Sequence, residues 1–264
     1  MRMMRTSLLA VASIAAIMMA SVSTASAATY VFTYSGTVSS GYDYTGDFGA
    51  AGGDLTGKDF KAVYTLTYPS ANVVSDFQDF AQHQVYGGSA YGSATSSPVS
   101  AAITVNGVTQ TIAGGYTGQA YLANYLGNNN GNFDLIQNDA VDYVDNYDQA
   151  TDSKIFIYNV AQNSYKSYLT NFLGSNSFDQ NLDIPVNEGE PFGYFRLNQS
   201  ITDYTSGIFF QHHDSFAYMN TDHISLSSAL PEPNIWSLMI IGLGVVGMAM
   251  RAKRRRGIVG VGYA

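Results

Sequence analysis

The chain has 264 residues, no cysteine and a formal net charge of −8 at pH 7. Five of the 12 basic residues and 19 of the 20 acidic residues lie in residues 28–230, which gives that stretch a net charge of −14. This charge argues against nucleic acid as a partner, because clustered Lys and Arg are needed to hold a polyanionic backbone. The lack of cysteine excludes disulfides and thiolate chemistry, so packing and hydrogen bonds must supply the stability.

The first 27 residues have the composition of a secretory signal peptide. Arg2 and Arg5 form a short basic region, residues 8–20 are apolar, and Ala25 and Ala27 are the small residues that a signal peptidase recognises. A permanent amino-terminal helix is the alternative, but the apolar run is shorter than the roughly 20 residues that a membrane span needs. We therefore predict signal peptidase cleavage after Ala27 and an exported protein.

Residues 28–230 are predicted to form a single β-rich domain, because polar and apolar residues alternate and turn-forming residues recur at short intervals. The clearest local prediction is a hairpin, in which residues 99–105 and 108–112 are joined by Asn106-Gly107, the pair that best adopts a type I′ turn. The other predicted strands are 30–35, 64–68, 119–126, 133–137, 155–160, 192–197, 208–212 and 224–227. Residues 73–84 are predicted to hold a short helix, with Phe77 and Phe80 on one face.

This pattern favours an all-β fold, a single β-sandwich of the jelly-roll type, flanked by an N-terminal signal helix and a C-terminal transmembrane helix. A closed barrel and a β-solenoid are alternatives. The sequence shows no fixed-period repeat of the kind that a solenoid requires.

Catalytic signatures are absent from the sequence, including H-E-x-x-H, G-x-S-x-G and the P-loop. Of the four histidines, His83, His212, His213 and His223, the adjacent pair would point to opposite faces of a strand, so at most one of the pair can join His223. Glu188, Glu190 and the aspartates supply acids for a glycan hydrolase, but nothing fixes two of them at the required separation. We predict a protein that is not an enzyme.

Two residue types that are abundant in the sequence, aspartate and tyrosine, suggest ligands. A run of acidic residues could hold Ca²⁺, a cation that takes roughly six to eight oxygen ligands, although its spacing is not that of an EF-hand and loop carboxylates are usually only solvated. The candidate ligands are Asp139, Asp142, Asp145 and Asp148. The 20 tyrosines could stack on sugars and bond to their hydroxyls, or could simply be strand residues.

Residues 231–256 combine three features in a fixed order. Pro231, Glu232 and Pro233 are followed by the apolar run 235–250 and by a basic cluster at Arg251, Lys253, Arg254, Arg255 and Arg256. As a helix, the apolar run would be about 24 Å long, which is short for a membrane span unless the basic residues snorkel. The same basic residues would stay cytoplasmic, so residues 28–230 would face outward.

This order and spacing resemble the PEP-CTERM sorting signal of Gram-negative bacteria, in the variant with Trp three residues after the second proline, here Trp236. The resemblance covers about a tenth of the chain and implies processing by an exosortase and a destination at the cell surface or in the extracellular matrix. Ser237 stands where alanine is usual, and the short tail 257–264 extends past the point where such signals normally end. A permanent membrane anchor is the alternative.

From the sequence we expect an exported surface or matrix protein that is anchored transiently in the inner membrane and is structural or adhesive. A carbohydrate-binding module acting on exopolysaccharide is the second hypothesis, and an extracellular glycan hydrolase is the third. The expected processing partners are signal peptidase and an exosortase, and no cofactor other than Ca²⁺ is suggested.

Overall fold

The computed structural model describes residues 27–92, 96–125, 132–169, 171–206 and 208–228, with only the backbone of 208–211. This part of the chain is almost entirely strand. The strands are β1 (Ala28–Asp43), β2 (Gly53–Asp54), β3 (Asp59–Tyr68), β4 (Val73–Gln78), β5 (Gln82–Gly87), β6 (Val99–Val105), β7 (Val108–Ile112), β8 (Thr117–Tyr125), β9 (Phe133–Asp148), β10 (Ser153–Ser167), β11 (Leu182–Pro185), β12 (Glu190–Asp203) and β13 (Ile208–Ser228). One 3₁₀ turn, η1 (Ser89–Tyr91), follows β5. The all-β prediction is confirmed.

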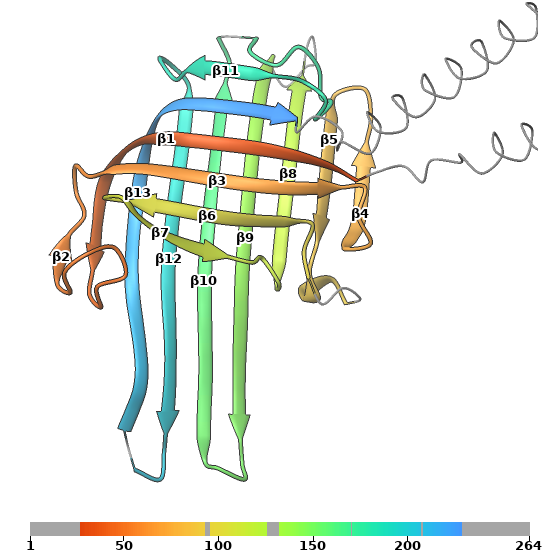
Figure 1. The fold of residues 1–264 in the computed structure, drawn as a ribbon. Helices are drawn as coiled ribbons and strands as arrows, with labels where there is room; N and C mark the ends of the chain where they lie inside the picture. Colours follow the sequence, from red (N-terminus) through yellow and green to blue (C-terminus); the bar gives the residue numbers. More distant parts are fainter. Residues whose placement is uncertain (1–26, 93–95, 126–131, 170, 207, 229–264) are drawn as a thin grey trace, which may run out of the picture.

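All the strands belong to one antiparallel sheet with the order β4-β5-β8-β9-β10-β12-β13-β1-β3-β6-β7, while β11 pairs with β13 and β2 with β1. The sheet curls so that one half packs across the other, with β6 and β7 crossing over β8, β9 and β10 (Figure 1). The first layer contains β4, β5, β8, β9, β10, β12 and the beginning of β13. The second layer contains β11, the end of β13, β1, β3, β6 and β7, and its strands cross those of the first layer.

The curl depends on two long strands that change direction. β13 pairs with β12 through its first half and with β1 from Ser215 onward, so it belongs to both layers. The β1–β13 register shifts at Ser35/Gly36 and again at Val38/Ser40, and such bulges bend a sheet at its corners. A Cβ on Gly36 would lie 2.1 Å from the carbonyl oxygen of Asn220, so the bend requires glycine at this position.

The core fills the space between the layers. Its largest fully buried side chains include Phe32, Phe48 and Phe195, and the Phe48 and Phe195 ring centroids are 4.9 Å apart. Two hydrogen bonds cross the core, each 2.8 Å long, from the Tyr34 hydroxyl to Asn138 Oδ1 and from the Tyr64 hydroxyl to Asn163 Oδ1. These bonds satisfy the buried hydroxyls that tyrosine brings into a core. Burial also raises the pKa of both hydroxyls well above the ordinary value.

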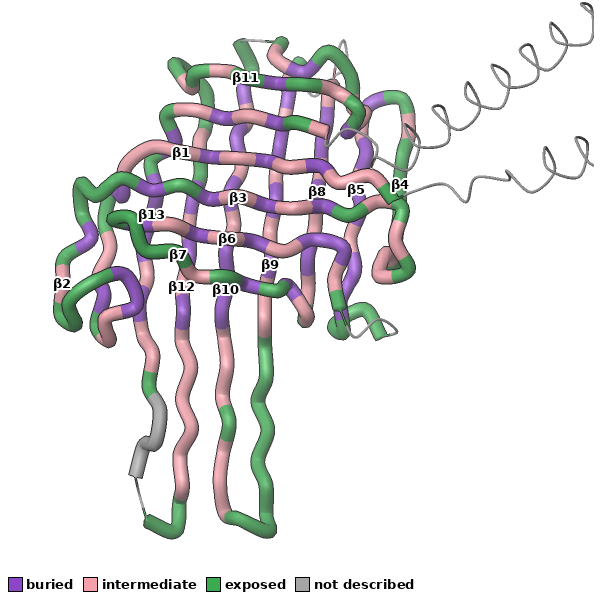
Figure 2. Tube along the Cα trace, viewed as in Figure 1, coloured by how far each residue is buried: buried purple, intermediate pink, exposed green. Residues whose placement is uncertain are grey.

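The first-layer strands continue beyond the core as a structure that we call the extension, residues 142–159 and 198–214. β8 pairs with β9 only as far as Val141, and β1 pairs with β13 only as far as Ser215. Below these points β9, β10, β12 and β13 form a four-stranded ribbon that the second layer does not cover (Figure 1). Most of its residues are exposed or half-buried (Figure 2).

Several local predictions are confirmed. The predicted hairpin is β6 and β7, and Asn106 and Gly107 have φ values of 51° and 80°, as a type I′ turn requires. Each other predicted strand also coincides with a strand, although most of the observed strands are longer. The predicted strands 208–212 and 224–227 are the two ends of the single strand β13.

One prediction is wrong. The helix predicted at residues 73–84 is instead the hairpin of β4 and β5, in which Phe77 pairs with Gln84. The all-β domain is built from one continuous sheet, curled into two layers, with the strand order given above. The two helices predicted to flank the domain lie outside the described residues, and no described helix is long and apolar enough to cross a membrane.

Candidate functional site

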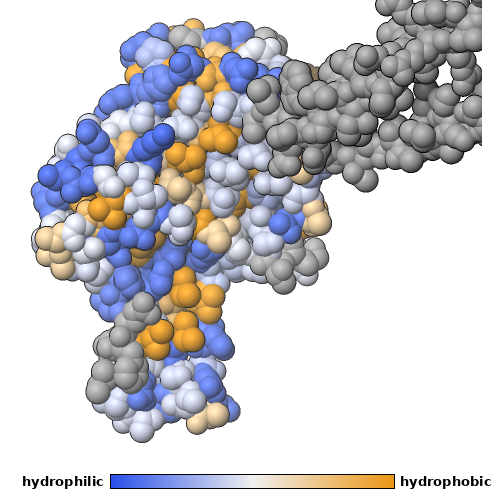
Figure 3. Space-filling view, viewed as in Figure 1, coloured by the Kyte–Doolittle hydropathy of each residue, from blue (hydrophilic) through white to orange (hydrophobic). Residues whose placement is uncertain are grey.

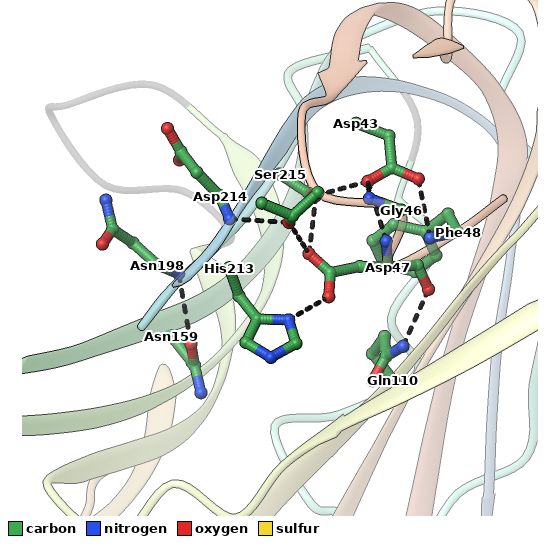
Figure 4. A network of polar contacts seen from close by, with 11 residues as sticks. Asp43, Gly46, Asp47, Phe48, Gln110, Asn159, Asn198, His213, Asp214 and Ser215 are labelled. Carbon is green, nitrogen blue, oxygen red and sulfur yellow. Dashed lines mark hydrogen bonds and ion pairs between the residues drawn. The ribbon is translucent and has the colours of Figure 1, made fainter. Parts of the chain in front are cut away.

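A network of buried polar groups lies where the core ends and the extension begins (Figure 4). Asp43, the last residue of β1, is almost fully buried and accepts hydrogen bonds from the amides of Gly46, Asp47 and Phe48, each 2.8 Å long, and from the Ser215 hydroxyl at 2.7 Å. Burial alone would raise the pKa of Asp43, but these hydrogen bonds stabilise the carboxylate and leave its pKa below the ordinary value.

Asp47 joins the loop after β1 to β13. Its Oδ1 lies 2.6 Å from His213 Nδ1, and its Oδ2 accepts a hydrogen bond from Thr45 at 2.9 Å. The same Oδ2 is 2.7 Å from the Ser215 hydroxyl, whose single proton is shared between Asp43 and Asp47. Its backbone carbonyl accepts a 2.7 Å hydrogen bond from Gln110 on β7. The network therefore fastens β1, β7 and β13 to one another.

Ser215, His213 and Asp47 are the residue types of a hydrolytic triad, but their connectivity differs from one. In such a triad the imidazole lies between the serine and the acid and takes the serine proton. Here the buried Ser215 hydroxyl contacts the carboxylates of Asp43 and Asp47, and the imidazole is bonded to the other oxygen of Asp47. We assign the network a structural role.

His83 and His223 also lie next to acids, each in a different place. His83 Nε2 is 3.0 Å from Asp76, and His223 Nε2 is 3.0 Å from Asp183 near the surface. Burial lowers the pKa of His83, although Asp76 opposes this shift. His212 and His213 pair with Ser200 and Gln199 and so lie on opposite faces of the extension, as the sequence predicted. Two histidines therefore do not share one site.

The acidic run is part of a strand rather than a loop. Asp139, Asp142, Asp145 and Asp148 all lie on β9, and their spacing of three places successive members on alternate faces. Asp142 accepts hydrogen bonds from the amides of Ala113 and Gly115, and Asp145 pairs with Lys154 at 2.8 Å. No group of three or more His, Asp or Glu side chains in the described residues is arranged to hold a metal ion.

A cavity of about 400 Å³ opens at the free edge of β9, directly below the end of β8. Its lining combines apolar and polar side chains, among them Tyr116, Tyr143, Ile157, Asn159 and Gln199. The Tyr116 and Tyr143 ring centroids are 5.1 Å apart. This cavity was not predicted from the sequence. Its lining residues are far apart in the chain, and only the pairing of the strands brings them together.

A line of polar and aromatic side chains lies on the outer face of the first layer, which points away from the second layer. The ladder registers place six residues of six neighbouring strands in one line across this face. We call this line, together with Tyr91 of η1, the outer row: Tyr86, Gln119, Asp139, Gln162, Tyr194, Tyr218 and Tyr91. Strands are about 4.8 Å apart, so the six strands place Tyr86 and Tyr218 about 24 Å from each other.

Each end of the outer row holds a pair of tyrosine rings. The Tyr86 and Tyr91 centroids are 4.6 Å apart, and those of Tyr194 and Tyr218 are 5.1 Å apart. Tyr91 is 46 % exposed and Tyr218 is 48 % exposed. Asp139 lies between the two pairs, and its partial burial raises the pKa of its carboxyl to about 7. Of the predicted calcium residues, Asp139 alone belongs to this row.

The residues predicted to direct export and sorting are not placed by the structure. Ala27 is the first described residue, and Ala25 precedes it. The Pro231-Glu232-Pro233 element, Trp236 and the basic cluster that begins at Arg251 all lie outside the described residues.

The described part of the chain is thus a curled, all-β, single-sheet domain with an uncovered extension and a tyrosine-rich outer face. No protein-family model, curated protein or solved structure matches this chain.

Proposed function

We propose that this chain is an exported cell-surface or extracellular-matrix protein with a structural or adhesive, non-catalytic role. The observation that carries the proposal is the order of the carboxyl-terminal segment, Pro231-Glu232-Pro233, an apolar run and a basic cluster, at the other end of a chain that begins like a signal peptide. Between a signal helix and a transient membrane helix, the curled sheet would serve as the sandwich-like domain outside the cell.

The surface of the extension also supports an adhesive role. The extension presents two uncovered faces and the free edges of β9 and β13, which are surfaces suited to contact with other molecules. Its inward-facing apolar side chains include Val144, Ile155, Ile157 and Ile201, and a hydrophobic patch is visible on the extension below the core (Figure 3). An apolar surface of this kind favours adhesion.

Fractionation of cells tests the sorting proposal. The natural chain is compared with a variant in which Pro231, Glu232 and Pro233 are all replaced by alanine. We expect the natural chain in the outer surface or matrix fraction and the variant in the inner membrane, because the exosortase is expected to act at this element. If both chains distribute identically, the sorting proposal is wrong.

A second candidate function is carbohydrate binding, and the outer row favours it. Tyrosine rings stack on the apolar faces of sugars, and tyrosine hydroxyls bond to sugar oxygens. A glycan array probed with the purified chain tests this candidate, and uniformly blank binding would refute it. Release of reducing ends from envelope polysaccharide would instead support the third hypothesis, a glycan hydrolase.

A further inference from the structure

The centre of the outer row contains polar side chains that the protein itself does not use. Gln119 and Gln162 are the cross-strand neighbours of Asp139 on β8 and β10, so two amides flank one carboxyl. None of the three side chains has a hydrogen-bond partner among the described residues, although all three are only partly exposed. Their polar atoms can therefore bond to water, or to a ligand that displaces this water.

The arrangement of these groups indicates what such a ligand would look like. Two aromatic pairs lie at the ends of a line about 24 Å long, and hydrogen-bonding groups lie between them. The line runs across the strands, so it fits an extended chain lying perpendicular to them. Aromatic rings suit the apolar faces of sugars, while amides and a carboxyl offer both donors and acceptors to hydroxyl groups.

The charge of the domain distinguishes between uncharged and anionic polysaccharides as ligands. Residues 28–230 carry a net charge of −14, and Asp139 at the centre of the row adds negative charge when it is ionised. A polyanion would be repelled by this field. The row itself contains no Lys or Arg to neutralise sugar acids or phosphates, and the neighbouring Arg196, which interacts with Tyr194, also lies 3.5 Å from Asp214.

We propose that the outer row binds an extended, uncharged polysaccharide across strands β5 to β13, with Tyr86/Tyr91 and Tyr194/Tyr218 stacking on sugar rings and Gln119, Asp139 and Gln162 bonding to hydroxyls between them. The proposal rests on carbohydrate binding as the function and adds the site and the class of ligand.

Affinity electrophoresis of the full chain tests the proposal, with gels that contain hydroxyethylcellulose or galactomannan as neutral probes and alginate as an anionic probe. We expect a neutral probe to retard the natural chain and alginate to leave its mobility unchanged. The variants Tyr218→Ala and Tyr91→Ala should each bind about tenfold more weakly, which corresponds to about 1.4 kcal/mol. Tyr204→Ala is the matched control, because Tyr204 is 52 % exposed and lies outside the row, in the turn after β12.

Two further variants separate binding from folding. Gln162→Leu keeps the side-chain volume and removes the amide, so it should weaken binding while the circular dichroism spectrum stays native. Tyr218→Phe keeps the ring and should retain most of the binding. If Gln162→Leu, Tyr218→Ala and Tyr91→Ala all bind like the natural chain, the assigned site is wrong.

The possible failures are distinguishable. Retardation by a neutral probe that no outer-row variant changes overturns the site but leaves carbohydrate binding in place. Retardation by alginate alone overturns the uncharged ligand. No retardation by either neutral probe overturns this proposal, whereas carbohydrate binding as such is judged by the glycan array and export by fractionation.

Discussion

The core and the extension are built from the same strands, yet the two regions differ in burial. On β12, Phe195 and Leu197 are buried beneath the second layer, whereas Ile201, on the same face four residues after Leu197, is only half-buried. On β9, Ile136 and Ala140 are fully buried, but Val144 is 40 % exposed. Apolar and polar residues continue to alternate along each strand into the extension, but the second layer that covers the core does not extend that far.

The difference teaches that an alternating pattern predicts a strand but does not predict what covers it. A strand can present an apolar face wherever alternate residues are apolar. That face becomes core only where a second layer excludes water from it. In this protein β7 is the last strand of the covering layer, and the polar network around Asp47 marks the boundary (Figure 4).

The largest expected effect comes from emptying the core. Phe195→Ala should lower the free energy of unfolding by about 3–5 kcal/mol, because a buried ring is lost and a cavity remains next to Phe48. The matched variant in the extension is Ile201→Ala, on the same strand and face, which should cost about 1 kcal/mol or less. Urea unfolding of the two variants measures the difference. Equal losses would mean that the extension is as tightly packed as the core.

A smaller effect is expected from the core hydrogen bonds. Tyr34→Phe removes the hydroxyl that donates to Asn138, whose Nδ2 already has no partner among the described residues, so stability should fall by about 1–3 kcal/mol. Tyr147→Phe in the extension removes an exposed hydrogen bond to Asp152 and should change stability little, because water replaces the partner. Thermal unfolding followed by circular dichroism compares them. A large loss in Tyr147→Phe would contradict the comparison.

The pH dependence of stability should reveal Asp139. Its folded pKa of about 7 lies above the ordinary value of 3.8, so the folded state holds a proton that the unfolded state releases. Stability from this group is present below pH 4 and is lost as pH rises to about 7. Asp139→Asn should therefore raise the melting temperature by a few degrees at pH 8, at roughly 2–4 °C per kcal/mol, and leave it unchanged near pH 4. Equal shifts at both pH values would refute this assignment.

The smallest effect is expected at the exposed ion pair of the extension. Lys154 and Asp145 lie 2.8 Å apart, but both side chains are about a third exposed or more. Exposed pairs of this kind contribute little and are screened by salt. Lys154→Ala should leave the unfolding midpoint unchanged at both low and high salt. A salt-sensitive loss would show that the extension is less hydrated than its exposure indicates.

Much of the secondary structure was predictable from local patterns. Asn106-Gly107 identified its hairpin because few other pairs favour two positive φ values. The helix at residues 73–84 was predicted wrongly because Phe77 and Phe80 have helical spacing, yet Phe77 lies in β4 and Phe80 in the turn that follows it. The acidic part of β9 was not predicted as strand, because its charges resemble those of a loop.

The candidate sites were beyond the reach of local patterns. Asp47 and His213 are 166 residues apart in the chain, and the curl of the sheet brings them together. The outer row draws one residue from each of six strands, so a shift of one residue in any ladder would remove a member from the face. The tyrosine excess led only to the hypothesis of carbohydrate binding, and the strand register was needed to propose where such a site would lie.

The pairing of β1 with β13 has a consequence for how the chain folds during its synthesis. β1 is the first described strand and β13 the last, and each is the other's neighbour in the sheet, with Tyr30 opposite Ser228. In a chain that is synthesised from its amino end, β1 can pair with β3 early, but it meets β13 only after almost the whole domain has been made. Contacts of such long sequence separation form slowly. We expect the rate of folding to be limited by the pairing of β1 with β13, so that the second layer is completed only after β13 has been synthesised.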